Sequence, residues 1–246
     1  TQIRKINGWV LNNDYCSLCD DIDFSIVKGK LISKIPNGPG GGKGISLWNL
    51  PDEIDDFKKY FSEHNDIIVE EYIEQHPLLS ALHKESVNTI RLVTFSHNNE
   101  ISVLSMIIRM GVGNNYVDNA HFGGIFCGID NNGKLKKYAY NNRGDKFECH
   151  PTSKITFEGY VIPNINECIM TVKTIAMRLS NTNKLLHWDM AIDKDGNPVF
   201  VEVNMAMGEL DFHQMTNGPL FGDMTKDVIE EVFQQKSKRI IQKVYT

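Results

Sequence analysis

The sequence contains neither a long apolar run nor an excess of positive charge. No apolar stretch approaches the roughly 18 residues that a membrane-spanning helix needs, so we expect no membrane span. Lys and Arg number 26 against 31 Asp and Glu, a net charge of −5, and this balance provides no broad basic surface for nucleic acid. Because 41% of the residues are hydrophobic and 23% are charged, the composition also excludes bulk disorder and collagen-like repeats.

Cysteine is scarce as well, and its spacing is irregular. The five cysteines form an odd set, which is a poor disulfide framework and indicates a reducing, cytoplasmic location. Cys16 and Cys19 make a CxxC pair, but the chain has no second CxxC or HxxxH segment to complete a zinc site. We therefore expect two ordinary thiols here.

Hairpin signals dominate the pattern of expected elements. Turn sequences such as HNNE and DNNG separate neighbouring apolar segments. The expected strands cover residues 23–35 (two strands turning at Gly29), 45–48, 66–73, 88–96, 101–109, 123–129, 134–140, 184–193 and 197–204, and the expected helices cover 51–64, 164–181 and 223–245. This order predicts an α+β fold with mostly antiparallel sheets, rather than a doubly wound parallel sheet.

A glycine-rich loop, PNGPGGGKG, occupies residues 36–44. Such a loop lets backbone N–H groups approach a phosphate closely. It does not match the Walker A pattern, because Lys43 precedes Gly44 rather than Ser or Thr. Its place between two strands is typical of a flap over nucleotide phosphates, with a surface loop as the alternative. Lys34, just upstream, is a candidate phosphate ligand or else a solvated surface lysine.

The segment 184–204, KLLHWDMAIDKDGNPVFVEVN, predicts an acidic hairpin. If Asp195 and Gly196 form a two-residue turn, Asp189 lies opposite Glu202. Two carboxylates placed in this way repel one another, and oxygen ligands of this kind suit Mg²⁺ or Mn²⁺. A solvent-exposed acidic face is the alternative. On this register one face carries His187, Asp189, Ala191, Phe200, Glu202 and Asn204, and the other, apolar face carries Trp188, Met190, Ile192, Val199, Val201 and Val203.

Four motifs in this order resemble those of the ATP-grasp superfamily. They are ISKI with Lys34, the flap GPGGGKG, the hinge segment VEEYI at 69–73, and the pair HWDMAID and VFVEVN. The segments HKESVNTIRLVTF, IIRMGVGNNYVDNAHFGGIFCGID and EVNMAMGELDFHQ further resemble the sugar-transfer-associated ATP-grasp group, which is linked with surface polysaccharide biosynthesis. The resemblance implies two lobes that clasp a nucleotide, with the flap and the adenine hinge in residues 1–74 and the metal site in residues 75–246.

The resemblance also implies a role for individual residues. The implied ATP-binding residues are Lys34, Gly40, Gly41, Gly42, Lys43, Gly44, Glu70, Glu71, Tyr72 and Ile73, with backbone groups of Glu71 and Ile73 at the adenine edge. The implied metal ligands are Asp189, Glu202 and Asn204. The implied substrate-binding residues are Asn119, His121, Gly123, Gly124, His213 and Gln214, for which a purely structural role in loops is the alternative.

Two arginines are candidates for the catalytic role of neutralising charge on a transferred phosphoryl group. Arg91 lies in NTIR and Arg109 at the end of the next expected strand. A regular hairpin around Asn98 and Asn99 places them on opposite faces of the sheet, unless a bulge intervenes. We therefore favour Arg91, with a surface arginine as the alternative.

The resemblance implies an ATP- and Mg²⁺-dependent carboxylate–amine ligase, which forms a carbon–nitrogen bond through an acyl phosphate. The substrate class that it suggests is a sugar acid or a polysaccharide precursor. A kinase acting on a small-molecule hydroxyl and a non-catalytic nucleotide-binding module are the alternatives. The sequence starts with TQIRKINGWV, without an initiator Met, and it has little room for the additional N-terminal domain that such ligases carry. We therefore expect a shortened chain, or a compact variant whose acceptor site is completed elsewhere.

Overall fold

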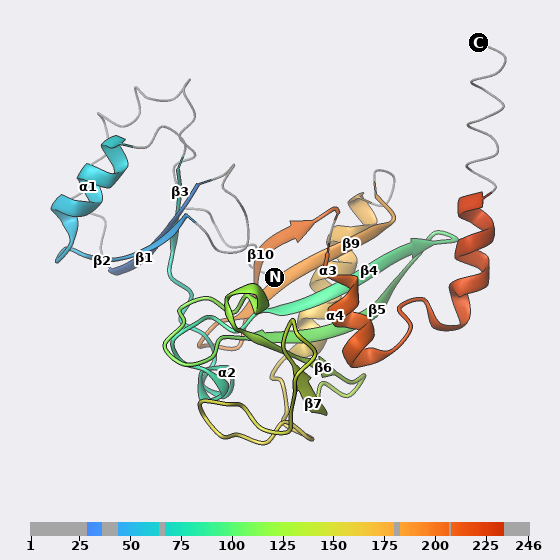
Figure 1. Ribbon diagram of the computed structural model, residues 1–246. Helices are drawn as coiled ribbons and strands as arrows, with labels where there is room; N and C mark the ends of the chain where they lie inside the picture. Colours follow the sequence, from blue (N-terminus) through green and yellow to red (C-terminus); the bar gives the residue numbers. More distant parts are fainter. Residues whose placement is uncertain (1–28, 36–43, 64–66, 180–182, 207, 234–246) are drawn as a thin grey trace, which may run out of the picture.

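The computed structural model describes residues 29–35, 44–63, 67–179, 183–206 and 208–233. These residues form a three-stranded sheet in the order β2-β1-β3 and a seven-stranded sheet in the order β10-β9-β4-β5-β6-β7-β8. Every strand pair is antiparallel, so the α+β prediction is confirmed. Figure 1 shows the two sheets as separate lobes. None of the helices in the described part of the chain is long and apolar enough to span a bilayer.

The small lobe consists of β1 (Gly29–Lys34), β2 (Ile45–Leu50), β3 (Ile68–Glu71) and helix α1 (Ile54–Glu63). α1 buries Phe57 and Phe61 against one face of the sheet, where they meet Leu31 and Val69. Because side chains alternate along a strand, Lys34 in β1 faces away from α1. The other half of the strand pair expected over 23–35 lies outside the described residues, and the predicted boundary after residue 74 stays a prediction.

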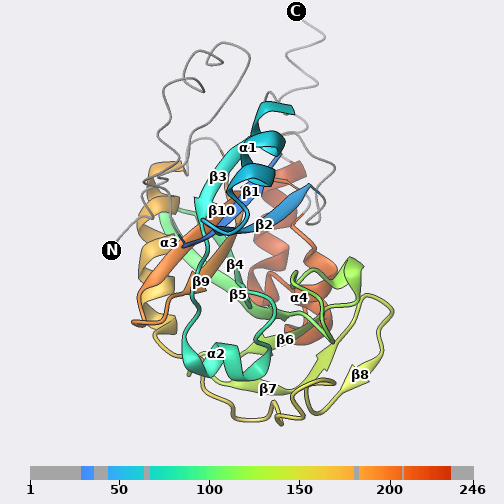
Figure 2. The ribbon, with the colours of Figure 1, turned by 90° about the vertical axis from the view of Figure 1, so that its left-hand side faces the viewer.

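The large lobe is built on β4 (Ile90–His97), β5 (Glu100–Met110), β6 (Ile125–Ile129), β7 (Leu135–Tyr140), β8 (Lys146–Phe147), β9 (Leu185–Ile192) and β10 (Pro198–Asn204). Helix α3 (Ile165–Leu179) covers one face of this sheet and helix α4 (Leu210–Asn217) covers the other (Figure 2). Ile108 packs with the α3 side, whereas its neighbour Ile107 packs with Phe212 of α4. The sheet therefore has apolar packing on both of its faces.

Some elements differ from the sequence-based expectations. Helices α2 (Pro77–Leu82) and α4 were not expected. Helix α3 and the β6–β7 hairpin lie where they were predicted. Residues 225–233 are helical, within the helix expected over 223–245, and the rest of that helix lies outside the described residues.

The β4–β5 hairpin contains a β-bulge that corrects the predicted faces of the two arginines. Asn98 and Asn99 form the tight turn with positive φ values of 50° and 64°. Val93 pairs with Ser105 but Thr94 pairs with Val103, so that Leu104 is an extra residue. Because one inserted residue inverts the alternation, Arg91 pairs with Ile107 and shares a face with Arg109.

The β9–β10 hairpin also departs from a regular ladder, in two places. Its loop spans five residues, 193–197, closed by Asp193 Oδ1, which accepts hydrogen bonds from the N–H groups of Asp195 and Asn197. The two-residue turn predicted at Asp195 and Gly196 is therefore wrong. Phe200 pairs with Met190, and Glu202 pairs with Asp189, which leaves Val201 as a bulge.

The bulge also changes two side-chain positions. Phe200 packs edge-on against Trp188 in the core, not on the polar face as predicted. Val201, predicted to lie in the core, lines the cleft described below.

Candidate active site

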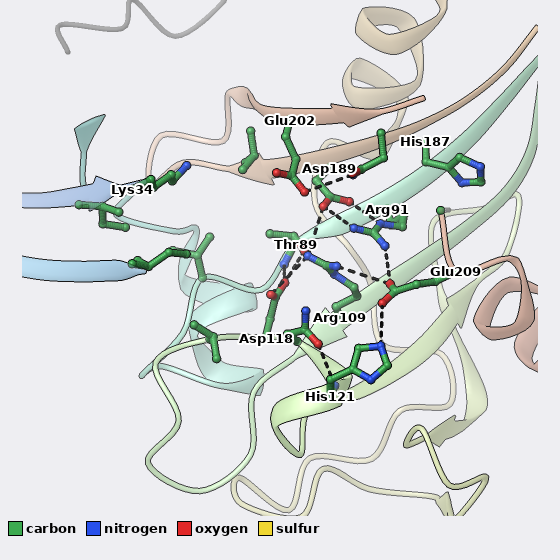
Figure 3. A pocket seen from close by; sticks show the side chains of 18 of the residues that line it. Lys34, Thr89, Arg91, Arg109, Asp118, His121, His187, Asp189, Glu202 and Glu209 are labelled. Atoms are coloured by element: carbon green, nitrogen blue, oxygen red, sulfur yellow. Dashed lines mark hydrogen bonds and ion pairs between the residues drawn. The ribbon is translucent and has the colours of Figure 1, made fainter. Parts of the chain in front are cut away.

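The two lobes enclose a cleft of about 1180 Å³ (Figure 3). It brings together most of the predicted site residues from both sheets. The predicted residues that line it are Lys34, Glu70, Tyr72, Ile73, Arg91, Arg109, Asn119, His121, Asp189, Glu202 and Asn204. Gly40, Gly41, Gly42 and Lys43 of the flap lie outside the described residues, so their role stays a prediction.

The small-lobe wall combines one lysine with an apolar surface. Lys34 Nζ lies 2.5 Å from Glu70 Oε2 on the neighbouring strand β3. Ile32 and Ile68 lie beside this pair, and Tyr72 continues the wall toward the large lobe. An apolar slot beside a cation suits a planar aromatic group that carries phosphates. The backbone contacts predicted for Glu71 and Ile73 stay predictions, and Gly44 and Glu71 are not among the lining residues.

Arg91 and Asp189 form the centre of the large-lobe wall. They are paired across β4 and β9, and Arg91 Nε and Nη2 donate to Asp189 Oδ1 and Oδ2, each at 2.6 Å. Both residues are buried, with 5% and 1% exposure. Burial raises the pKa of the Asp189 carboxyl, but Arg109 and Arg91 lower it more, to about 2. Asp189 is therefore an ionised anchor for the arginine.

Arg109 reaches the same anchor from β5. Its Nη2 lies 3.2 Å from Asp189 Oδ2 and 3.4 Å from Asp118 Oδ1. Its Nε donates to Thr89 Oγ1 at 3.1 Å, and the Thr89 hydroxyl donates to Asp118. Burial lowers the pKa of Arg109, but Asp118 and Asp189 raise it more, so the guanidinium stays charged.

Glu202 and Asn204 lie beside this cluster on β10. Asn204 Nδ2 donates to Glu202 Oε1 at 3.2 Å. Burial raises the pKa of Glu202, and the facing Asp189 carboxylate raises it further. A cation would relieve both penalties, so these two oxygen donors fit a divalent metal in kind. Both oxygens of Asp189, in contrast, are already paired with Arg91.

The metal assignment nevertheless stays a prediction. Within the described ranges, no group of three or more His, Cys, Asp and Glu side chains is arranged to hold a metal ion. The arginines supply the positive charge that partly compensates Asp189, so the carboxylate pair does not by itself require a metal. The predicted opposition of Asp189 and Glu202 is observed, but it is not sufficient to identify the ligands.

Glu209, which was not singled out from the sequence, completes the arginine cluster. It caps α4 in a left-handed conformation, with φ of 56° and ψ of 51°. Its carboxylate pairs with Arg91 Nη1, lies 3.7 Å from Arg109 Nη1 and lies 3.6 Å from His121 Nε2. Thr89 was also missed, whereas Asp118 begins the candidate substrate segment 118–124 that carries Asn119 and His121. No local pattern marks Thr89 or Glu209, because their arginine partners lie 20 residues or more away in sequence.

The structure places four predicted substrate-binding residues away from the lining of the cleft. His213 is fully buried on the face of α4 that packs against the sheet, where its Nδ1 lies 2.8 Å from Ser105 Oγ, and burial lowers its pKa to about 3. Gln214, next to it, is exposed. Gly123 and Gly124 shape the loop that carries Asn119 and His121: Gly123 has a φ of +87°, and a Cβ on Gly124 would meet backbone oxygens at 2.6–2.9 Å.

His187 occupies the cleft wall two residues before Asp189 on the same strand. It is 3% exposed, and burial and the nearby Arg91 lower its pKa to about 4. A Cβ on Gly208 would lie 2.0 Å from the His187 ring. The backbone at Gly208, directly before Glu209, therefore packs against this imidazole.

Comparisons with known proteins identify the family of this chain. The protein family described as sugar-transfer associated ATP-grasp matches residues 55–229. Among solved structures, the VanG D-Ala:D-Ser ligase from Enterococcus faecalis is similar with a TM-score of 0.51 at 14% identity, over 91% of this chain and 53% of that chain. The D-alanine–D-alanine ligase from Bacillus anthracis is similar with a TM-score of 0.46 at 16% identity, over 95% of this chain and 64% of that chain.

A third similar structure is the biotin carboxylase domain of the 2-oxoglutarate carboxylase from Hydrogenobacter thermophilus, with a TM-score of 0.49 at 14% identity, over 87% of this chain and 39% of that chain. This chain thus spans less than two thirds of each of the three structures. A search of curated proteins found no match.

At such low identity, the similarity to VanG ligase establishes the fold but not the activity. The family match covers well over half of the chain and confirms both the superfamily and the narrower group predicted from the motifs. The chain therefore belongs to the sugar-transfer associated ATP-grasp family.

Proposed function

We propose that the protein is an ATP-dependent ligase that joins a carboxylate to an amine through an acyl phosphate. The observation that carries this proposal is the cluster of Arg91, Arg109 and Asp189, which faces Lys34 across one cleft. Phosphoryl transfer needs positioned cations around the phosphate oxygens more than it needs a protein nucleophile. The cleft offers this arrangement, and its described lining contains no Cys or Ser.

Each side chain has a separate task in this proposal. Lys34 would bind the phosphates of ATP at the small-lobe end. Arg91 and Arg109 would stabilise the negative charge that develops during transfer, in fixed positions that Asp189 and Thr89 hold. Glu202 and Asn204, with Asp189 beside them, would hold magnesium, which when bound shields phosphate charge.

The proposed reaction has two balanced steps. A carboxylate oxygen of the donor attacks the γ-phosphorus, and the bond to the bridging oxygen breaks, which releases ADP. The neutral amine then attacks the acyl carbon, inorganic phosphate leaves with the C–O electron pair, and the amine proton passes to solvent or phosphate. Burial of the arginine cluster keeps water away from the acyl phosphate.

Family membership supports a sugar acid or a related polysaccharide precursor as the donor, and a cytoplasmic location follows from an ATP substrate. The amine is not specified by the described cleft residues. This chain spans about half of the VanG ligase, and the acceptor is therefore assigned only as an amine.

The test incubates the protein with ATP, Mg²⁺, a panel of uronic acids and a panel of amines, and it measures ADP and phosphate separately. We expect equal amounts of both, and a hydroxamate when hydroxylamine replaces the amine. Arg91→Lys should lose most of the activity, whereas Arg178→Lys, on the exposed side of α3, should retain it. ADP without phosphate would identify a kinase instead, and no ADP with any carboxylate would overturn the proposal.

A further inference from the structure

The two arginines direct their remaining nitrogens at a single point. Arg91 uses Nε and Nη2 on Asp189, and Arg109 uses Nε on Thr89 and Nη2 on Asp118 and Asp189. The nitrogen left on each guanidinium is Nη1, and both Nη1 atoms face Glu209 Oε2. The donors that the other acids of the cluster leave free are thus paired with a carboxylate of the protein itself, that of Glu209 (Figure 3).

Glu209 is more exposed than the other two acids that pair with the arginines, Asp118 and Asp189. Its side chain is 19% exposed, compared with 1% for Asp189. Its backbone is in the left-handed region, which a non-glycine residue adopts at a cost that the surroundings must offset. Asp189 is enclosed between two arginines and lacks an exit to solvent, whereas the Glu209 carboxylate already borders the open mouth beside His121, which is 61% exposed.

The charge of the cleft favours a monoanion at this point. Its described lining residues include seven Asp and Glu side chains but three Lys and Arg. At the point between the two Nη1 atoms, a carboxylate that replaces Glu209 leaves the local charge unchanged, whereas a dianionic phosphate adds one more negative charge. Each Nη1 can donate a charge-assisted hydrogen bond to a carboxylate oxygen.

We propose that the point between Arg91 Nη1 and Arg109 Nη1 is the subsite for the donor's carboxylate, and that Glu209 fills this subsite until the donor displaces it. The term "donor" rests on the ligase function proposed above; the subsite itself rests on the contacts of the two arginines. Donor binding then exchanges one carboxylate for another, and Glu209 moves toward the mouth of the cleft.

The test measures binding rather than catalysis. Acetate labelled with ¹³C is titrated by NMR into the wild-type chain and into Glu209→Gln, which keeps the shape of the side chain and removes its charge. Glu209→Gln removes the competing ion pair, so acetate binding should tighten by about tenfold. This change corresponds to about 1.4 kcal/mol. Arg91→Lys in the Glu209→Gln background should abolish the gain.

The matched control is Asp211→Asn, which removes one charge from the same cleft lining and changes none of the ion pairs described for the two arginines. It should change acetate binding by less than about twofold, since a screened surface charge contributes little. Equal tightening in both variants would reduce the effect to net charge and overturn the proposal. Unchanged or weaker acetate binding in Glu209→Gln would also overturn it, and Glu209→Ala repeats the measurement without an amide that could occupy the site.

Inorganic phosphate serves as the second probe. If Glu209→Gln gains more affinity for phosphate than for acetate, the subsite takes a phosphoryl group and the carboxylate assignment is wrong. Circular dichroism and the unfolding midpoint verify that each variant is folded. A tenfold gain for acetate in a chain that never forms ADP would support the subsite while the ligase proposal fails, and ADP formation without that gain would refute the subsite alone.

Discussion

Glu202 lies opposite Asp189 because two irregularities of one hairpin compensate each other. The five-residue loop shifts the pairing next to it, so that Phe200 faces Met190, and the bulge at Val201 shifts it back. Without the bulge, Val201 would pair with Asp189. The relationship places a carboxylate with a raised pKa beside one with a pKa of about 2, at the centre of the cleft.

Lys34→Met should weaken ATP binding. The substitution removes the cation that lines the small-lobe wall but keeps the length of the apolar stem. Since a charge-assisted hydrogen bond contributes about 1.5–3 kcal/mol, we expect a loss of affinity of at least about tenfold, measured by calorimetric titration with ATP. Lys59→Met is the matched control, because Lys59 is an exposed lysine of α1 outside the cleft lining; an equal loss there would contradict a specific role for Lys34.

Glu202→Gln should weaken binding of a divalent cation. The amide keeps one oxygen but removes the charged carboxylate, whose pKa is raised by burial and by Asp189. Binding of Mn²⁺ in the presence of ADP, followed by electron paramagnetic resonance, should fall by about tenfold or more. Glu63→Gln changes an exposed carboxylate at the end of α1 and should leave Mn²⁺ binding unaltered; if Glu202→Gln also leaves it unaltered, the metal site lies elsewhere.

Gly208→Ala should displace the segment that carries Glu209. A Cβ at this position would lie 2.0 Å from the His187 ring, and overpacking of this kind costs about 1–3 kcal/mol. Urea denaturation should show this loss. His187→Ala provides the space that the methyl group needs, so the double variant should recover part of the stability, and strictly additive losses would show that the two residues do not interact.

The free energy of unfolding should decrease as the pH falls, because buried neutral histidines resist protonation in the folded chain. His150 is fully buried, its Nε2 lies 2.9 Å from Gly111 O, and burial lowers its pKa from 6.5 to about 4. The unfolded chain therefore binds the proton more readily, and stability is lost as the pH falls from about 6.5 to about 4. The contribution is on the order of 3 kcal/mol.

The comparison that isolates this effect is wild type against His150→Gln, in urea denaturation at intervals between pH 7 and pH 4. The variant should be less stable at pH 7 and should lose less stability on acidification. Parallel curves for the two proteins would contradict the assignment. His187 and His213, whose pKa values are also lowered, retain part of the slope in the variant.

The residue types and their order along the chain were sufficient to predict the ATP-grasp family, the α+β class and the pairing of Asp189 with Glu202. These features are local: alternating apolar residues define strands, and Asn98 and Asn99 define a turn. Even so, the pairing of Glu202 with Asp189 was predicted from a two-residue turn that the chain does not form. The prediction is correct because the register shifts of the longer loop and of the bulge cancel.

Tertiary structure decided which side chains meet in the cleft. Strand alternation has a period of two, so one extra residue at Leu104 brings Arg91 and Arg109 to the same face, and nothing in the local pattern marks that residue. Packing beneath α4 buries His213, which the motif alone presents as a substrate ligand. Glu209 joins Arg91 from 118 residues away. The sequence by itself thus determined the chemical groups and the approximate strands, whereas long-range packing and two single-residue bulges determined how those groups face one another.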